Sequence, residues 1–483
     1  MQHAPSILEG LLACLSGPVV LQTGAITAVA MLASVVGNLF GHFYDKFIPL
    51  AKSMLSVQGD ESEVSILKGK AMEAISLMGQ AVGKERFMVD GHEMVKALLN
   101  NVLQGFFESG DPQLAYALMS CARIANVLRE EFLPYLPNVL TTLLQILSKE
   151  IETSVVDADQ AGANSVDNLF QGKDVVQVNV RGAGSHLIAL NTAEVQEKEM
   201  CAQTLYQLVS DMGVLMAPWV AQITPLIIPL LKYKAQETIR IVAAAAIPKL
   251  LQIGIDGAAA GSVHSTLPQE LFNAFLPPLV QVLKEGASSG ELEPYCIAAD
   301  ALAQLLKMHQ DHHALADAGT LPRLLPSLPP DQVQTLLTEL RDATAASLTR
   351  SQQRVGSVQA EEDYDEEEYD VFEEDESWER DLLTSVLEGA GALIKHFKHD
   401  IFQVFHSIFG GLIENLVPDL TASVGVRSFI YCLCIDCLEN CGEQAQIYLP
   451  KLIPSILQGV SDSNEEIRQA CAYAVGVCSV YGG

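Results

Sequence analysis

Apolar residues recur every three or four positions through most of the chain, which is the period of an amphipathic helix. One motif opens many of these runs: an apolar residue, two residues of any kind, a second apolar residue, one of any kind, and a proline. Its copies end at Pro49, Pro137, Pro225, Pro277 and Pro454. The first three prolines are 88 residues apart. Half that interval falls in the period of about 40–47 residues that is typical of HEAT-type repeats.

A proline in the first turn of a helix costs no hydrogen bond, so each motif is predicted to start a first helix. Second helices rich in small residues follow, at Glu63–Ala81, Pro112–Leu128, Glu237–Ile253, Pro294–Met308, Val424–Cys441 and Asn464–Val480. The pattern predicts an all-α fold, a HEAT-repeat superhelical solenoid of the armadillo-like kind. About eight helix pairs and a lone N-terminal helix are expected, each pair burying its apolar faces against its neighbours.

Two segments interrupt the rhythm. Glycines and an alternating run at Val176–Val180 replace the helical period between Ile151 and Asn191, which indicates an insertion with a short strand or hairpin. The second segment is acidic. The predicted organisation is a partial N-terminal repeat (1–42), HEAT repeats (43–150), a loop inserted within a repeat (151–191), HEAT repeats (192–350), an acidic disordered loop (351–378) and HEAT repeats (379–483).

The acidic segment runs from Glu361 to Glu376, where twelve of sixteen residues are acidic and none is basic. Such a run repels itself and is expected to stay disordered until it meets a counter-charge. Two interpretations stand side by side, a flexible surface for a basic cargo or regulator and a solvated linker. The residues proposed to carry the charge are Glu361, Glu362, Asp363, Asp365, Glu366, Glu367, Glu368 and Asp370.

The formal charge of -30 argues against direct binding of nucleic acid and favours a basic protein partner. Ten cysteines without framework spacing indicate a reducing compartment, cytoplasm and nucleus. The stretch from Gly10 to Tyr44 lacks Asp, Glu, Lys and Arg, but glycines and Pro18 interrupt it, so a packed helix is favoured over membrane insertion.

No pattern assembles a catalytic or metal site. The sequence GASSG at Gly286–Gly290 matches a nucleophile elbow but follows a helix where that turn needs a strand. Cys434, Cys437 and Cys441 share a helix face that Cys432 leaves, which favours buried thiols over zinc. His309, His312 and His313 are interpreted as solvated residues at a helix end. No enzyme activity, cofactor or metal is therefore predicted.

One long stretch, LKGKAMEAISLMGQAVGKERFM from Leu67 to Met88, closely resembles the importin beta-3 branch of the karyopherin-beta nuclear import receptors. DPQLAYALMSCARI from Asp111, IRIVAAAAIPKLL from Ile239 and EIRQACAYAVGVCSVYGG from Glu466 extend the resemblance in order. The inserted and acidic segments fall where that branch carries its own insertions. The resemblance spans nearly the whole chain, is weakest from Ala258 to Arg350, and corresponds to the middle repeats of a longer receptor.

The resemblance implies a receptor that carries basic cargo, such as localisation signals, ribosomal proteins and histones, on its concave second helices. It also implies contact with nuclear pore repeat proteins and release of cargo by the Ran GTPase, whose main site is expected outside this chain. Candidate cargo-binding residues are the polar positions of second helices that can escape the packed seam: Lys70, Glu73, Gln80, Tyr116, Ser120, Arg123 and Arg240. Glu73 leads them because a carboxylate pairs directly with Lys or Arg.

Two other classes stay open. A HEAT scaffold of an enzyme complex, such as a phosphatase regulatory subunit, predicts a fixed enzyme partner and no response to Ran. An enzyme would need a site that the motifs above do not supply.

Overall fold

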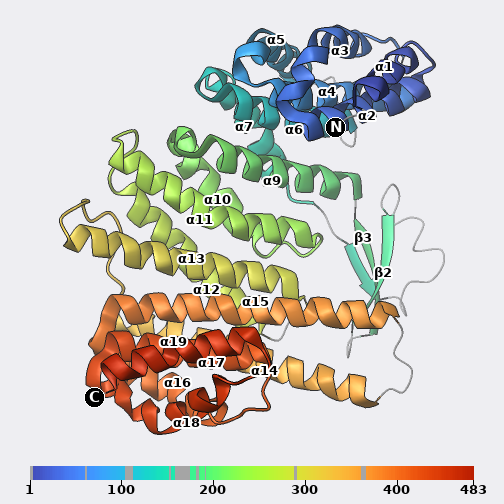
Figure 1. Cartoon of the computed structure of the whole chain (residues 1–483). Helices are drawn as coiled ribbons and strands as arrows, with labels where there is room; N and C mark the ends of the chain where they lie inside the picture. The colour runs from blue at the N-terminus through green and yellow to red at the C-terminus, as the bar shows by residue number, and fades with distance from the viewer. Residues whose placement is uncertain are drawn as a thin grey trace. The chain divides into compact units, whose positions relative to one another are not determined.

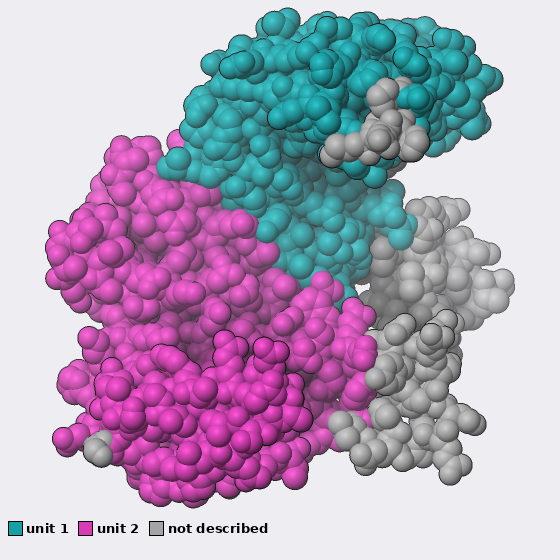
Figure 2. All heavy atoms as spheres, viewed as in Figure 1, with its two compact units in different colours: residues 1–216, 233–242 teal, residues 217–232, 243–483 magenta. Residues whose placement is uncertain are grey.

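The computed structural model describes residues 4–59, 62–103, 112–151, 154–157, 174–180, 184–190, 192–287, 291–360 and 366–482. These residues are mainly helical, and two compact units divide them (Figures 1 and 2). Unit 1 comprises residues 1–216 and 233–242, and unit 2 comprises residues 217–232 and 243–483. Within each unit, first and second helices alternate along the chain.

The first helices are α1 (Ala4–Cys14), α3 (Gly41–Met54), α5 (Lys84–Leu103), α7 (Leu136–Ser148), α10 (Val220–Leu230), α12 (Leu267–Gly286), α14 (Pro330–Ala360), α16 (Phe402–Leu416) and α18 (Leu449–Gly459). The second helices are α2 (Val19–Val36), α4 (Ser62–Val82), α6 (Pro112–Leu128), α9 (Thr192–Met212), α11 (Glu237–Ala259), α13 (Leu292–Asp317), α15 (Glu366–Phe397), α17 (Val424–Cys441) and α19 (Glu465–Tyr481). Short 3₁₀ turns are η1 (Gly37–Phe40), η2 (Arg129–Phe132), η3 (Gly213–Trp219), η4 (Lys398–Ile401) and η5 (Gly442–Tyr448).

Second helices stack on one another inside each unit. In unit 1, α2, α4, α6 and α9 pack in that order, with α1, α3, α5 and α7 against them. In unit 2, α13, α15, α17 and α19 form the same kind of row, with α12, α14, α16 and α18 beside it. The core of each unit is therefore a seam between two rows of helices, as expected of repeats that bury their apolar faces against their neighbours.

The segment 1–42 holds two helices where the sequence predicted a lone one. Its apolar run is broken at Gly17 and Pro18, and Pro18 precedes the first residue of α2. Proline fixes its own φ and disfavours helical geometry in the residue before it. Hence α1 and α2 fold as a packed pair, and the described chain alternates more helix pairs than predicted.

The prolines of the repeated motif are mostly not in first turns. Pro137 is, at the start of α7, but Pro49, Pro225, Pro277 and Pro454 lie inside their helices. The prediction is wrong for these four, since the chain becomes helical before the motif ends. A proline there forfeits one backbone hydrogen bond. Burial of the neighbouring apolar side chains, such as Phe47 and Ile48 beside Pro49, offsets the loss.

The inserted segment contributes three antiparallel strands, β1 (Ser154–Asp157), β2 (Asp174–Val180) and β3 (Gly184–Leu190), in the order β1-β3-β2. In β2 and β3, Asp174 pairs with Leu190 and Val180 with Gly184. The predicted alternating run Val176–Val180 is thus part of a strand. The sheet lies between α7 and α9 in sequence, and these two helices still pack together as one pair.

The predicted disordered loop over 351–378 is wrong for most of its length. Helix α14 continues to Ala360, and α15 begins at Glu366. Residues 361–365 lie outside the described residues. Arg354 of α14 lies 3.2 Å from Glu376, so part of the self-repulsion that favoured disorder is neutralised within the chain.

Candidate functional site on the second helices

The site in unit 1 forms where α4, α6 and α9 stack. Lys70 and Glu73 are one turn apart on α4, and Tyr116 and Arg123 come from α6. Gly69 makes the close approach possible, because a Cβ at that position would lie 2.2 Å from Cδ2 of Tyr116. The sequence places a glycine where the tyrosine ring crosses α4, and this brings Tyr116 next to Lys70.

Glu73 is the centre of a partly buried ion cluster. Its Oε2 lies 2.8 Å from Nζ of Lys70, and its Oε1 lies 3.7 Å from Nη2 of Arg123. Nζ of Lys70 also lies 5.0 Å from the centre of the Tyr116 ring, a cation–π contact. The structure thus brings together four of the seven predicted site residues, and Glu73 already has cationic neighbours inside the chain.

Burial and pairing act in opposite directions on the charges of this cluster. Burial by itself lowers the pKa of Lys70, but the hydrogen bonds to Glu73 and Tyr116 outweigh it and the pKa is raised. For Arg123, burial dominates over the attraction of Glu73, and the pKa is lowered. Nη1 of Arg123 is buried without a hydrogen-bond partner.

A pocket of about 410 Å³ opens beside the cluster. Lys70, Glu73 and Tyr116 form part of its wall, and Glu197 of α9 adds a second carboxylate. The remaining lining is largely apolar: Leu114, Ala115, Met119, Ala193, Gln196 and Met200. Apolar walls with a few convergent polar groups suit a long side chain with a polar end.

The other predicted site residues do not join the cluster. Gln80 is exposed near the end of α4, and Arg240 of α11 donates a hydrogen bond from Nη1 to the carbonyl of Tyr233. Ser120 is 0% exposed and its hydroxyl has no partner, so it cannot contact a cargo and its prediction is wrong. A second helix is packed by neighbours on both sides, and Ser120 faces one of them.

A row of carboxylates on α13, α15 and α17 in unit 2 was missed by sequence reasoning. Burial raises the pKa of Asp300, and the nearby charges of Glu388 and Asp381 raise it further against a hydrogen bond from Gln304. Burial also raises the pKa of Asp436, although Lys395 lies 3.2 Å away. Each residue is unremarkable in sequence, and only the stacking of three second helices places them together.

Helix α14 contacts α15 at the C-terminal end of the acidic segment and just beyond it. Arg350 forms two hydrogen bonds with the carboxylate of Glu379, of 2.7 and 2.9 Å. Arg354 reaches Glu379 at 2.8 Å and Glu376 at 3.2 Å. Of the predicted charge-carrying residues, Glu361, Glu362, Asp363 and Asp365 lie outside the described residues, whereas Glu366, Glu367, Glu368 and Asp370 belong to α15.

The cysteines were predicted to be buried thiols, and the histidines were predicted to be solvated residues at a helix end. Cys434, Cys437 and Cys441 are buried free thiols, and Cys432 is only half-buried, as expected. The histidine prediction is wrong, because His309, His312 and His313 are 1%, 5% and 3% exposed. Within the described ranges, no group of three or more His, Cys, Asp or Glu has the geometry to hold a metal ion.

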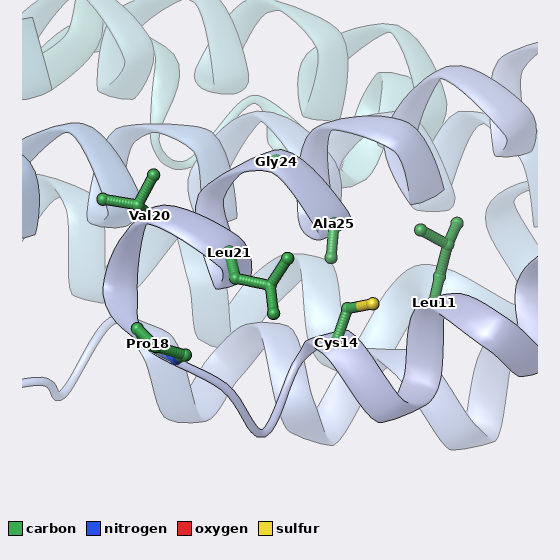
Figure 3. A pocket seen from close by; sticks show the side chains of 7 residues that line it. All are labelled: Leu11, Cys14, Pro18, Val20, Leu21, Gly24 and Ala25. Atoms are coloured by element: carbon green, nitrogen blue, oxygen red, sulfur yellow. The ribbon is translucent and has the colours of Figure 1, made fainter.

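An apolar pocket of about 480 Å³ lies on the first two helices (Figure 3). Leu11 and Cys14 of α1 face Leu21 and Ala25 of α2 across it, with Pro18 at the turn. Its lining offers no charged group. The pocket can therefore take only apolar groups.

Three described stretches are long and apolar enough to cross a membrane by length and composition: Val19–Met54, Thr192–Leu230 and Glu237–Ala259. The first has a mean hydropathy of 2.0. It contains α2 and α3, both of which pack against α4. Of its most apolar window, 28% is buried in the structure.

Comparisons with known proteins agree with this architecture. The importin repeat 6 family model matches residues 326–417, and the HEAT repeat model matches residues 452–480. Importin subunit beta-3 of Saccharomyces cerevisiae is 26% identical over 99% of this chain and 40% of its own length. The probable importin-5 homolog of Dictyostelium discoideum is 22% identical over 95% of this chain and 39% of its own.

Solved structures show the same fold. The crystal structure of Kap121p bound to Nup53p matches with a TM-score of 0.75 and 22% identity over 99% of this chain and 40% of that one. Kap121p by itself matches with a TM-score of 0.76 and 23% identity, over 99% of this chain and 41% of that one. Other structures show Kap121p bound to Pho4p and to Ste12p.

The stacked helix pairs, the HEAT repeat match and the solved structures define a HEAT-repeat solenoid, and residues 326–417 match an importin repeat. The chain is similar to importin subunit beta-3 along nearly its whole length, as the resemblance in the sequence indicated. It spans about 40% of the length of the relatives that it matches. The relatives named here are transport proteins rather than enzymes.

Proposed function

We propose that this chain binds basic segments of partner proteins on its second helices and so serves nuclear import. The observation that carries the proposal is a set of carboxylates on successive second helices: Asp300 and Asp436 are half-buried and have raised pKa, and Asp381 and Glu388 are exposed. Burial is the main cause of both shifts, and at Asp300 the nearby carboxylates Glu388 and Asp381 add negative potential, which a bound cation would relieve. The net charge of -30 steers basic partners to the protein.

The pocket between α4, α6 and α9 supports the same proposal in unit 1. A Lys or Arg side chain of the cargo would lay its stem on Met119 and Met200 and place its charge between Glu73 and Glu197. Lys70 already pairs with Glu73. We therefore propose that a cargo cation binds in addition to Lys70 and does not displace it.

Relatives support the cellular role. Both curated relatives are named importins, and Kap121p has been solved with several bound proteins, Nup53p among them. We accordingly propose contact with nuclear pore proteins, regulation by Ran through a main site outside this chain, and passage between cytoplasm and nucleus. The names of the relatives and the Kap121p complex with Nup53p support these proposals.

The test is titration of the full chain with a fluorescent Lys-rich histone-tail peptide at low and physiological salt. Glu388→Lys is expected to weaken binding about two- to fivefold, the size of effect that loss of one exposed ion pair with the peptide has. Asp331→Lys makes the same charge change on an exposed position of the first helix α14 and is the matched control. Affinity is expected to fall as salt rises, because exposed charges are screened.

Equal weakening by Glu388→Lys and Asp331→Lys would mean attraction to net charge alone and would contradict a second-helix site. Ran in its GTP form is then added to the complex. Loss of bound peptide would show that this chain responds to Ran, and unchanged binding would show that it holds cargo without that response. No binding at either salt concentration would overturn the proposal and favour the enzyme-complex scaffold.

A further inference from the structure

Four histidines gather where α13 meets α15 in unit 2. The ring centres of His309 and His313 are 4.3 Å apart, and the ring of His396 lies 4.9 Å from the first and 5.0 Å from the second. His312 lies beside them, 6.4 Å from His313. The three from α13 are almost fully buried. Neither the import proposal nor the acidic row uses this cluster.

The cluster holds the irregular connector between α13 and α14, residues 318–329. Nε2 of His309 and of His313 lie 2.8 and 3.1 Å from the carbonyl oxygen of Pro326. The backbone N–H of Leu324 donates to Nε2 of His312 at 3.1 Å. Leu324, Leu325 and Leu328 are buried, so this connector is part of the packed core.

These bonds define the protonation of the rings. A carbonyl oxygen only accepts, so His309 and His313 carry hydrogen on Nε2. His312 accepts at Nε2, so that nitrogen carries no hydrogen. Protonation of His312 would set its N–H against the N–H of Leu324. Protonation of the other rings would place like charges about 5 Å apart in a buried site.

We propose that the neutral imidazoles of this cluster latch the 318–329 connector onto α13, and that mild acid releases it. Few charged groups oppose this. Asp317 at the end of α13 and Arg323 of the connector act on His396 with opposite signs and pair with each other. The contacts from α12 and α15 come from Phe272, Phe397 and the imidazole of His396.

The direction of the pH effect follows from the burial of the rings. Burial lowers the pKa of His309 to about 3, and it lowers the pKa of His312 and of His396 as well, with neighbouring histidines adding to the effect. The released state has ordinary imidazoles with a pKa of about 6.5. The released state therefore binds more protons below pH 6.5. The contribution of the latch to stability is at its maximum above that pH and decreases as pH falls.

Hydrogen–deuterium exchange of residues 318–329 in the full chain tests the latch, with rates corrected for the pH dependence of free amides. Between pH 7.5 and 5.5, each imidazole that is neutral only when latched raises the opening constant about tenfold. Exchange of the connector is expected to rise at least tenfold. In His312→Gln, the amide oxygen can accept the hydrogen bond from Leu324 but does not titrate. The rise in exchange between pH 7.5 and 5.5 is expected to be about tenfold smaller in this variant than in the unsubstituted chain.

His264→Gln is the matched control, because His264 is exposed in the same unit and its loss should leave the response unchanged. Connector exchange that is independent of pH in the unsubstituted chain would overturn the proposal, whatever the variants do. An equal response in His312→Gln and the unsubstituted chain would also overturn it. Circular dichroism of both variants at pH 7.5 establishes that they fold.

Discussion

At the scale of single residues, the residue after several second helices has a positive φ, and the sequence places either a glycine or a basic residue there. Gly37 and Gly442 follow α2 and α17 with φ of 53° and 65°. At the corresponding points after α6 and α15, Arg129 and Lys398 adopt φ of 54° and 52°. This left-handed conformation strains a residue with a Cβ and suits glycine.

Lys398→Gly is expected to raise the free energy of unfolding by about 0.5–1 kcal/mol, because the strain is relieved at an exposed site. The expected readout is a higher midpoint in thermal unfolding followed by circular dichroism. Lys307→Gly, at an exposed interior position of α13, is the control and should destabilise by about 1 kcal/mol. A lower midpoint for Lys398→Gly would contradict the strain.

At the scale of helices, an ion cluster joins α14 to α15. Glu379 is 2% exposed, and its carboxylate accepts hydrogen bonds from both Arg350 and Arg354. Burial by itself raises the pKa of Glu379, but the arginine bonds outweigh it and the pKa is lowered. Arg350 also donates to the carbonyl of Ala287. The cluster thus joins the end of α12, α14 and the middle of α15.

Glu379→Ala is expected to destabilise unit 2 by about 3–5 kcal/mol, because two guanidinium groups lose a buried partner. The contribution of Glu379 is present above its ordinary pKa of about 4.3 and is lost as pH falls through its lower folded value. Urea unfolding at pH 7 measures the loss of stability, and the same experiment at pH 3 measures its pH dependence. Glu373→Ala, at an exposed position of α15, is the control. Equal stability of the two variants would contradict the cluster.

At the scale of the whole molecule, contacts run between neighbouring helices. Helix α4 packs against α2, α3, α5 and α6, and α15 packs against α13, α14 and α17. Stability in such a stack is a sum of local terms. A destabilising substitution in one unit should therefore leave the stability of the other unit unchanged.

Glu379→Ala is expected to reduce hydrogen-exchange protection in α13, α14 and α15 and to leave α4 and α6 unchanged. Mass spectrometry of peptides from these five helices measures the difference. Loss of protection to the same degree in α4 and α6 would show cooperative unfolding of the whole chain and contradict local stability.

The sequence by itself determined the class of fold and the alternation of helices, because the helical period and the small residues of second helices are local properties. It also located the inserted strand and the buried cysteine face. Tertiary structure decided which polar groups meet. Lys70 and Tyr116, Glu379 and Arg350, and His313 and His396 come from different helices, and their contacts depend on how each pair rotates on the next. For the same reason the sequence could not tell that Ser120 and the three histidines of α13 are buried: a second helix is covered on several sides, and its pattern shows which faces are apolar but not which polar positions a neighbour covers.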